Sequence, residues 1–138
     1  MENNIHLQVY RVDAVICNSQ VNYVELPIAG GPYGILSGHA PMMAQLTEGV
    51  AYYKTDEEKH YFAISGGVVR VENNEVVVLA RTAELAETID IARAQSSEKR
   101  ARERLRAHQS EVNMKRAEIS LNRALVREKA YDKAHDKK

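Results

Sequence analysis

Glycine and proline disappear from this chain halfway along its length. All seven glycines and all three prolines lie at or before Gly67, and 12 of the 14 valines lie at or before Val78. The later residues are mainly alanine, glutamate, lysine and arginine, which favour helices, whereas β-branched residues favour strands. The break predicts an α+β chain of two units, which we place at residues 1–84 and 85–138.

Alternating apolar residues predict a β-sandwich or flattened barrel in the first unit. Ile5, Leu7 and Val9 alternate with polar neighbours, and the later strands are expected at 21–25, 49–54, 60–64, 68–72 and 75–80. Turns are expected at 18–19 and 56–58, and at 73–74, where two asparagines tolerate the positive φ of a hairpin turn. Glycine and proline make 30–41 an expected irregular, exposed loop.

The second unit is predicted to be an antiparallel two-helix hairpin. Thr88 precedes a long stretch without glycine or proline, Asp90 suits the first turn of a helix, and a break is expected at 108–110. The expected seam residues are Ala94, Ser97, Ala101, Leu105 and His108 on the first helix and Met114, Ala117, Leu121 and Leu125 on the second. Such a hairpin is marginally stable alone, so it should either dock on the sandwich or move.

Charge divides along the same boundary. Lysine plus arginine and aspartate plus glutamate each total 19, but residues 1–84 carry 5 basic and 10 acidic side chains, whereas residues 85–138 carry 14 and 9. The zero net charge disfavours a globally basic nucleic-acid-binding protein. The basic half favours an acidic partner or ligand instead.

Two features bear on the compartment. Cys17 is the only cysteine, and the residues after Met1 form no charged-then-apolar leader, so a reducing cytoplasm is expected. The longest aliphatic run, Val76–Ala80, is far shorter than a membrane-spanning helix requires. Any membrane association should therefore go through a partner.

Sequence motifs of common active sites do not occur. The chain has no Gly-x-x-x-x-Gly-Lys-Ser/Thr, Gly-x-Gly-x-x-Gly or Gly-x-Ser-x-Gly, and its five histidines lack metal-ligand spacing. Ser65-Gly66-Gly67 precedes no predicted helix and is expected to be a tight turn or bulge between strands, not a phosphate loop. We therefore expect neither catalysis by this chain nor a bound metal.

The two predicted helices carry rows of charged residues at three-and-four spacing. The rows are Asp90, Arg93, Ser97, Arg100 and Arg104 on the first helix and Arg116, Arg123 and Arg127 on the second. In a closed hairpin they could form a pocket, because guanidinium groups bind phosphate oxygens and a carboxylate can accept a hydrogen bond from the amine of a base. Alternatively, both rows are solvated helix faces, and Asp90 and Arg93 form an ordinary helical ion pair.

His39 lies between Gly38 and Ala40-Pro41 in the expected loop. It is either a contact residue at a partner surface, since loops often carry recognition, or a solvent-exposed histidine. Its position alone leaves both interpretations open.

Four segments, spread along nearly the whole chain, form a recognisable set. Residues 34–41 read Gly-Ile-Leu-Ser-Gly-His-Ala-Pro, and the other segments are Ala63-Ile64-Ser65-Gly66-Gly67, Val76 to Ala80 followed by Ala83-Glu84, and Ile89-Asp90-Ile91-Ala92-Arg93-Ala94. In this order they resemble the epsilon subunits of bacterial F-type ATP synthases, whose loop reads Gly-Ile-Leu-Pro-Gly-His-x-Pro. The last segment matches the Ile/Leu-Asp-x-x-Arg-Ala pattern associated with ATP binding in some bacterial members.

The resemblance implies a non-catalytic rotor subunit of the central stalk, peripheral to the cytoplasmic face of the cell membrane, which couples ion translocation to ATP synthesis. In that family the sandwich binds the gamma subunit and rests on the c-ring, and the alpha and beta subunits carry out catalysis. The implied contacts with gamma and the c-ring are Tyr33, Ser37, Gly38 and His39. Ser37 replaces the usual proline, which loosens the loop, and 31–33 lacks the acidic residue of many members, so the ring contact should be less electrostatic.

By the same resemblance, ATP would be a regulatory ligand. The residues implied to hold it are Glu84, Asp90, Arg93, Arg100, Arg123 and Arg127. The hairpin would fold down on the sandwich when ATP bridges its helices, and would extend when ATP is scarce, so that its basic second helix meets the alpha and beta subunits and blocks hydrolysis. The alternatives are a purely structural coupling subunit without ATP binding or switching, and, outside the family, a small-ligand sensor or RNA-binding protein that uses the basic hairpin.

Overall fold

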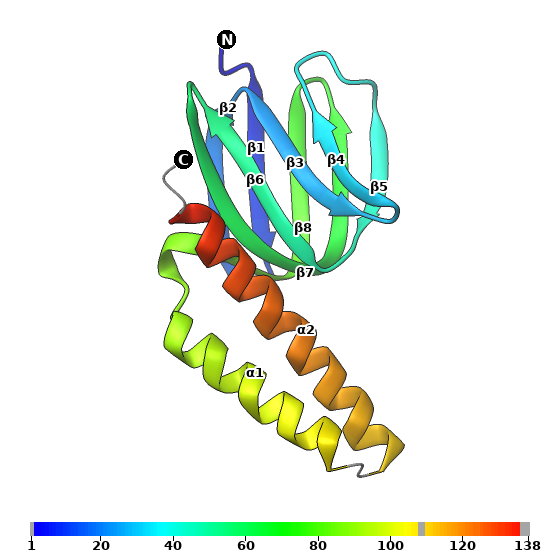
Figure 1. Cartoon of the computed structure of the whole chain (residues 1–138). Coiled ribbons are helices and arrows are strands. Elements are labelled where there is room, and N and C mark those ends of the chain that lie inside the picture. The colour runs from blue at the N-terminus through cyan, green and yellow to red at the C-terminus, as the bar shows by residue number, and fades with distance from the viewer. Residues whose placement is uncertain (1, 108–109, 136–138) are drawn as a thin grey trace.

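The computed structural model describes residues 2–107 and 110–135 and contains a β-sandwich followed by two helices (Figure 1). The first four strands are β1 (Ile5–Arg11), β2 (Ala14–Val21), β3 (Tyr23–Ile28) and β4 (Gly31–Ile35). The other four are β5 (Met42–Leu46), β6 (Gly49–Thr55), β7 (Glu58–Glu72) and β8 (Glu75–Leu85). A short 3-10 helix, η1 (Ala86–Thr88), leads to α1 (Ile91–Arg106) and α2 (Glu111–Ala134).

The strands hydrogen-bond in the order β2-β1-β8-β7-β5-β3-β4, and β6 pairs with both β3 and β7. Only the β1–β8 pair among the described strands is parallel. It places the first strand of the chain beside the last one. The bridging by β6 folds the sheet over itself, and the enclosed core includes Leu7, Val24, Phe62 and Val78, all at most 1% exposed. The expected β-sandwich followed by two helices is confirmed.

Two local expectations for the sandwich were wrong. The expected turn at 18–19 lies inside β2, where Asn18 and Ser19 pair with Gln8 and Leu7 of β1. Successive strand residues point to opposite faces, so Asn18 is exposed to solvent, whereas Ser19 lies on the same side as the buried Cys17, whose thiol donates to Ser19 Oγ at 3.8 Å. Part of the expected irregular loop is strand β4, which pairs only with β3 and tolerates Pro32 because an edge strand can lack a ladder donor.

Gly66 and Gly67 lie within one long strand, not between two strands as expected. Both have positive φ, 67° and 127°, and at this point β7 stops pairing with β6 and begins pairing with β5. A Cβ atom at Gly67 would lie 2.1 Å from the Leu79 carbonyl oxygen, so the bend requires glycine. The predicted strands 60–64 and 68–72 are therefore two halves of β7. The expected turns at 56–58 and 73–74 are confirmed, with positive φ at Asp56, Asn73 and Asn74.

The helices form an antiparallel hairpin in which α2 returns to the sandwich (Figure 1). The buried residues of the two helices are Ala94 and Ala101 of α1, and Ala117, Ala124 and Ala130 of α2, and of these Ala130 packs against the sandwich and not in the seam. The expected seam position Leu125 was wrong, because the spacing continues from 117 through 121 to 124 and leaves Leu125 38% exposed. His108, also expected in the seam, lies outside the described residues.

The C-terminal half of α2 docks on the sandwich. Ala130 packs in a second buried cluster with Ala63 of β7, and with Ala86 and Ile89, which connect β8 to α1. Val50, Tyr61, Val126 and Tyr131 cover this cluster. Of the two alternatives left open for the hairpin, docking and movement, the structure describes the docked arrangement.

Candidate functional site

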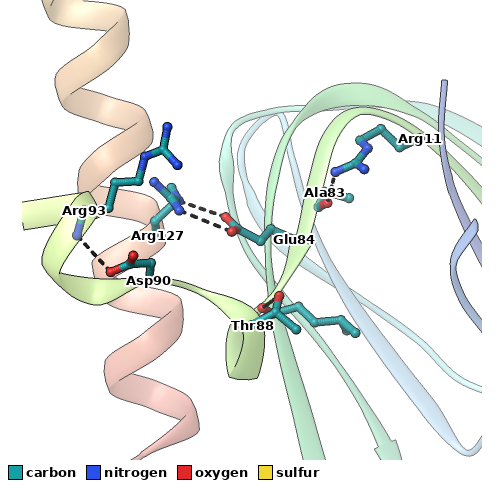
Figure 2. Close-up of polar contacts among 8 residues, drawn as sticks. Arg11, Ala83, Glu84, Thr88, Asp90, Arg93 and Arg127 are labelled. Carbon is teal, nitrogen blue, oxygen red and sulfur yellow. Dashed lines mark hydrogen bonds and ion pairs between the residues drawn. The ribbon is translucent and has the colours of Figure 1, made fainter. Parts of the chain in front are cut away.

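A bidentate ion pair joins the hairpin to the sandwich (Figure 2). Glu84, near the end of β8, accepts hydrogen bonds from Arg127 of α2, with Nε to Oε1 at 2.8 Å and Nη2 to Oε2 at 3.2 Å. The Arg127 and Glu84 side chains are 20% and 33% exposed. Such parallel guanidinium–carboxylate bonds are stronger and more directional than a surface ion pair. The pair therefore fixes α2 against the end of the sheet.

A cavity of about 280 Å³ opens beside this pair. Three arginines line it, namely Arg11 at the end of β1 and Arg123 and Arg127 on α2, together with the carboxylates Glu48 and Glu84. The formal charges of these five side chains sum to plus one, and the hydroxyls of Ser65 and Thr82 add further polar groups. The cavity is slightly smaller than typical ligand pockets, so in this closed form it suits an anionic group or one part of a larger ligand.

Arg11 also lines the cavity, although its strand, β1, is the strand farthest from α2 along the sequence. Its Nη1 donates to the Ala83 carbonyl oxygen at 3.5 Å, and its Nε pairs with the exposed Asp13 carboxylate at 2.7 Å (Figure 2 shows the former contact). Sequence reasoning missed Arg11, because the parallel pairing of β1 with β8 brings the end of β1 to the part of β8 that leads to Glu84, and both residues line the cavity. No local pattern in the sequence carries that information.

The six residues implied to hold ATP fall into three groups. Glu84, Arg123 and Arg127 line the cavity. Asp90 caps α1 by accepting from the Arg93 backbone N–H at 3.1 Å, and the Arg93 side chain points toward the same junction as Arg127 (Figure 2). Arg100 lies two helical turns farther along α1, about 10 Å by helix rise, where it donates to Ser97 Oγ at 3.3 Å. The structure brings the first group together and leaves Arg100 apart from it.

Three of the residues implied to contact partners, Ser37, Gly38 and His39, lie in the loop between β4 and β5, and Tyr33 lies in β4. Figure 1 shows this loop at the end of the sandwich opposite the hairpin. The Tyr33 hydroxyl lies 2.6 Å from His39 Nε2, and the two rings meet edge to face. His39 Nδ1 lies 2.6 Å from the Ala40 carbonyl oxygen, which only accepts, so Nδ1 carries a proton. In the neutral imidazole Nε2 is then the acceptor, and the Tyr33 hydroxyl donates to it.

A second turn holds the same loop. The Gly38 backbone N–H donates to Asn74 Oδ1 at 2.7 Å, and Asn74 belongs to the β7–β8 turn. Ser37 is exposed, and Leu36 presents an apolar side chain that is 49% exposed. The loop without the usual proline is thus braced by Tyr33 on one side and by Asn74 on the other.

The outer face of the sheet carries an exposed apolar row that sequence reasoning missed. Val68 pairs with Leu79, Leu79 with Tyr10, and Tyr10 with Val15, so the row crosses β7, β8, β1 and β2. Val68, Leu79 and Val15 are 38%, 58% and 62% exposed. The uninterrupted aliphatic run 76–80 could have indicated this surface. A strand that is apolar on both faces either is buried on both or exposes one apolar face that a partner can cover.

Within residues 2–107 and 110–135, no group of three or more histidine, cysteine, aspartate or glutamate side chains is arranged to hold a metal ion. The same residues include no helix with the length and apolar character needed to cross a membrane.

Two family models match consecutive parts of the chain. Residues 4–86 match the model of the ATP synthase delta/epsilon chain beta-sandwich domain, and residues 87–132 match that of the long alpha-helix domain. The chain is 40% identical to the ATP synthase epsilon chain of Nitratidesulfovibrio vulgaris (strain DP4), over 92% of this chain and 95% of that one. It is 43% identical to the ATP synthase epsilon chain of Symbiobacterium thermophilum, over 89% of each chain.

Solved structures extend the similarity to three dimensions. A chain in the Euglena gracilis mitochondrial ATP synthase assembly of OSCP, F1 and c-ring superposes with a TM-score of 0.82 at 25% identity, covering 93% of this chain and 81% of that one. A chain in the Tetrahymena thermophila mitochondrial ATP synthase central stalk and c-ring has a TM-score of 0.58 at 12% identity, covering 94% and 98%. The second match bears on the fold alone.

Proposed function

The chain belongs to the ATP synthase delta/epsilon chain family, as a non-catalytic epsilon chain, and from this premise we propose that it is a central-stalk rotor subunit whose hairpin responds to ATP. In this proposal residues 1–84 anchor the chain to the rotor, and residues 85–138 regulate ATP hydrolysis. Membrane contact goes through the complex, at the cytoplasmic face of the cell membrane.

The anchoring role is supported by two surfaces on the sandwich. The braced loop with Tyr33, Ser37, Gly38 and His39 is a preformed contact surface that suits the c-ring, and the apolar row Val68–Leu79–Tyr10–Val15 suits the gamma subunit. Exposed apolar side chains in one row are costly to leave in water, so a protein partner that covers them gains binding free energy.

The regulatory role is carried by one observation, the bidentate Glu84–Arg127 pair beside a cavity that also contains Arg123. A triphosphate entering this junction adds negative charge where arginines converge, and it ties α2 more firmly to the end of the sheet. The freed Glu84 carboxylate can then accept a hydrogen bond from the amine of the base. Changing the ratio of docked to extended hairpin from 1:99 to 99:1 needs about 5.5 kcal/mol of differential affinity. Several arginine–phosphate bonds supply a large share of this free energy.

When ATP is scarce, the hairpin leaves the sandwich and extends along the stalk. The exposed Lys115 and Arg116, with the released Arg123 and Arg127, then meet acidic surfaces of the alpha and beta subunits and oppose rotation in the hydrolysis direction. ATP and the catalytic subunits thus compete for the same arginines. The alternative within the family is a purely structural coupling subunit, in which the hairpin stays docked and binds no nucleotide.

Calorimetric titration of ATP into the isolated chain tests the proposed site. We expect Arg123→Ala to lower the affinity for ATP at least tenfold, about 1.4 kcal/mol, because a charge-assisted bond to phosphate is lost. Arg116→Ala is the matched control, since Arg116 lies on the same helix but not at the cavity, and its affinity should equal that of the wild type. Equal affinities in all three proteins, or no heat of binding, would reject ATP regulation and favour the structural alternative.

A further inference from the structure

A glutamate occupies the seam between the two helices. The seam of α2 follows the three-and-four spacing 117, 121 and 124, and the next position in this series is Glu128. Ala117 and Ala124 are buried there, at 0% and 2% exposure. A carboxyl group at such a position loses hydration when the helices pack, which is costly for its charged form.

The partner of Glu128 across the seam is a second glutamate. Glu98 on α1 is the acidic side chain that interacts with Glu128 across the seam, and Glu98 Oε2 lies 2.7 Å from Arg102 Nε. Among the side chains of the described residues, Glu128 Oε2 is the one buried oxygen or nitrogen without a hydrogen-bond partner. Two ionised carboxylates only accept, so the contact is a hydrogen bond only when one of them carries a proton.

Charged groups of both signs surround Glu128. Glu98 from α1 and Asp132 from α2 are both acidic, whereas Arg102 of α1 acts in the opposite direction. Lys129 and Lys133 of α2 share a shallow surface pocket with Glu128 and Asp132. Burial, followed by the contact with Glu98, raises the pKa of Glu128 to about 7. The interaction with Glu128, followed by the hydrogen bond from Arg102, lowers the pKa of Glu98, so Glu128 holds a shared proton more tightly than Glu98 does.

We propose that Glu98 and Glu128 share one proton across the α1–α2 seam, and that loss of this proton to solvent loosens the closed hairpin. Without the proton, two negative charges face each other in a partly dehydrated seam, and within the described residues the cation that bonds to the pair is Arg102, through Glu98. When the helices separate, both carboxylates regain water. The proton is therefore a ligand of the closed hairpin and not of the open one.

The direction of the pH dependence follows from the proton count. Glu128 has a pKa of about 7 in the closed hairpin and the ordinary value of 4.5 when released. Its stabilising contribution is fully present below pH 4.5 and is lost as the pH rises through about 7, and within this window the opening equilibrium constant increases up to about tenfold per pH unit. This dependence rests on helix packing alone and holds whether or not ATP binds.

Hydrogen exchange of the full chain tests this switch. The opening of α1 would be measured by mass spectrometry at pH 5.5, 6.5 and 7.5, after correction for intrinsic exchange rates. We expect the opening equilibrium constant of the wild type to rise more than tenfold over this range. Glu128→Gln, which keeps the shape of the protonated side chain, should remove the pH dependence and exchange at pH 7.5 as slowly as the wild type does at pH 5.5. Glu118→Gln is the matched control, because Glu118 is exposed on the same helix, and it should follow the wild type.

Carbon NMR of the glutamate carboxyl groups gives a second readout that does not depend on the stability of a variant. One glutamate of the wild type should titrate near pH 7, and in Glu98→Gln that titration should move toward lower pH. A wild type in which every glutamate titrates below pH 5.5 would overturn the proposal. A Glu128→Gln variant that opens with the same pH dependence as the wild type would overturn it as well.

Discussion

Asp90 has a structural role in the closed hairpin that is separate from any ligand. Its carboxylate accepts from the Arg93 backbone N–H and so caps α1, whereas the resemblance assigns the same side chain to the nucleotide. An N-cap needs only a short side chain with an acceptor oxygen, so asparagine can replace aspartate there. The charge of Asp90 and its capping bond are therefore separable by substitution.

We expect Asp90→Ala to destabilise α1 by about 1 kcal/mol, because the capping bond is lost. Asp90→Asn should leave the stability of the helix nearly unchanged. Thermal unfolding followed by circular dichroism at helix-sensitive wavelengths measures both variants. If Asp90→Asn unfolds as early as Asp90→Ala, the carboxylate stabilises the hairpin through its charge and not through the cap.

Gly67 allows β7 to bend from one pairing partner to the next. We expect Gly67→Ala to destabilise the sandwich by about 3 kcal/mol, because the new Cβ meets the Leu79 carbonyl in addition to a positive φ of 127°. Gly30→Ala is the control, since Gly30 also has positive φ but open space around its Cα, and it should cost about 1 kcal/mol. Urea unfolding would measure both, and equal losses would show that the close approach to Leu79 carries no penalty.

At the scale of elements, the loop between β4 and β5 depends on the turn between β7 and β8. The Asn74 side chain holds Gly38, while its positive φ of 62° shapes its own turn. The hydrogen bond from Gly38 to Asn74 restrains the loop in which Ser37 replaces proline. It also couples a candidate contact surface to strands at the centre of the sheet.

We expect Asn74→Gly to increase amide exchange at Gly38 at least tenfold while the sandwich stays folded, because glycine retains the positive φ but lacks the oxygen that accepts from Gly38. Asn73→Gly, at the neighbouring position with φ 50°, should leave Gly38 unchanged. NMR-detected hydrogen exchange gives both rates. Equal protection of Gly38 in Asn74→Gly and the wild type would mean that Tyr33 and His39 suffice to hold the loop.

At the scale of the whole molecule, a small apolar cluster and a bidentate ion pair, both among the described residues, hold the docked hairpin. Ala63 and Ala130 represent the cluster, and Glu84 and Arg127 form the pair. The contact is modest compared with the core of the sandwich, so we expect docking to be an equilibrium that the proposed ligand or the proposed shared proton can shift. A helical arm docked through a modest contact is what the proposed regulatory role requires.

Locking the hairpin distinguishes a regulatory arm from a structural one. A disulfide between Ala63→Cys and Ala130→Cys, in a Cys17→Ser background, would hold α2 on β7 in the assembled ATP synthase. At low ATP concentration we expect the oxidised complex to hydrolyse ATP at least twofold faster than the same complex after reduction, because the arm cannot extend. Identical rates in the two forms would favour the purely structural role.

The sequence by itself determined the two-unit organisation, the strand and helix classes, the asparagine hairpin turn and the family, because composition, periodicity and short motifs are local properties. It did not reveal that β7 runs through two glycines or that 31–35 is a strand, since both depend on pairing partners elsewhere in the chain. Only the tertiary structure decided that Glu84 meets Arg127 across 43 residues, that Arg11 shares their cavity, and that Glu98 faces Glu128. The physical reason is that the docking angle of α2 and the register of β1 on β8 set these contacts, and both result from packing the whole core.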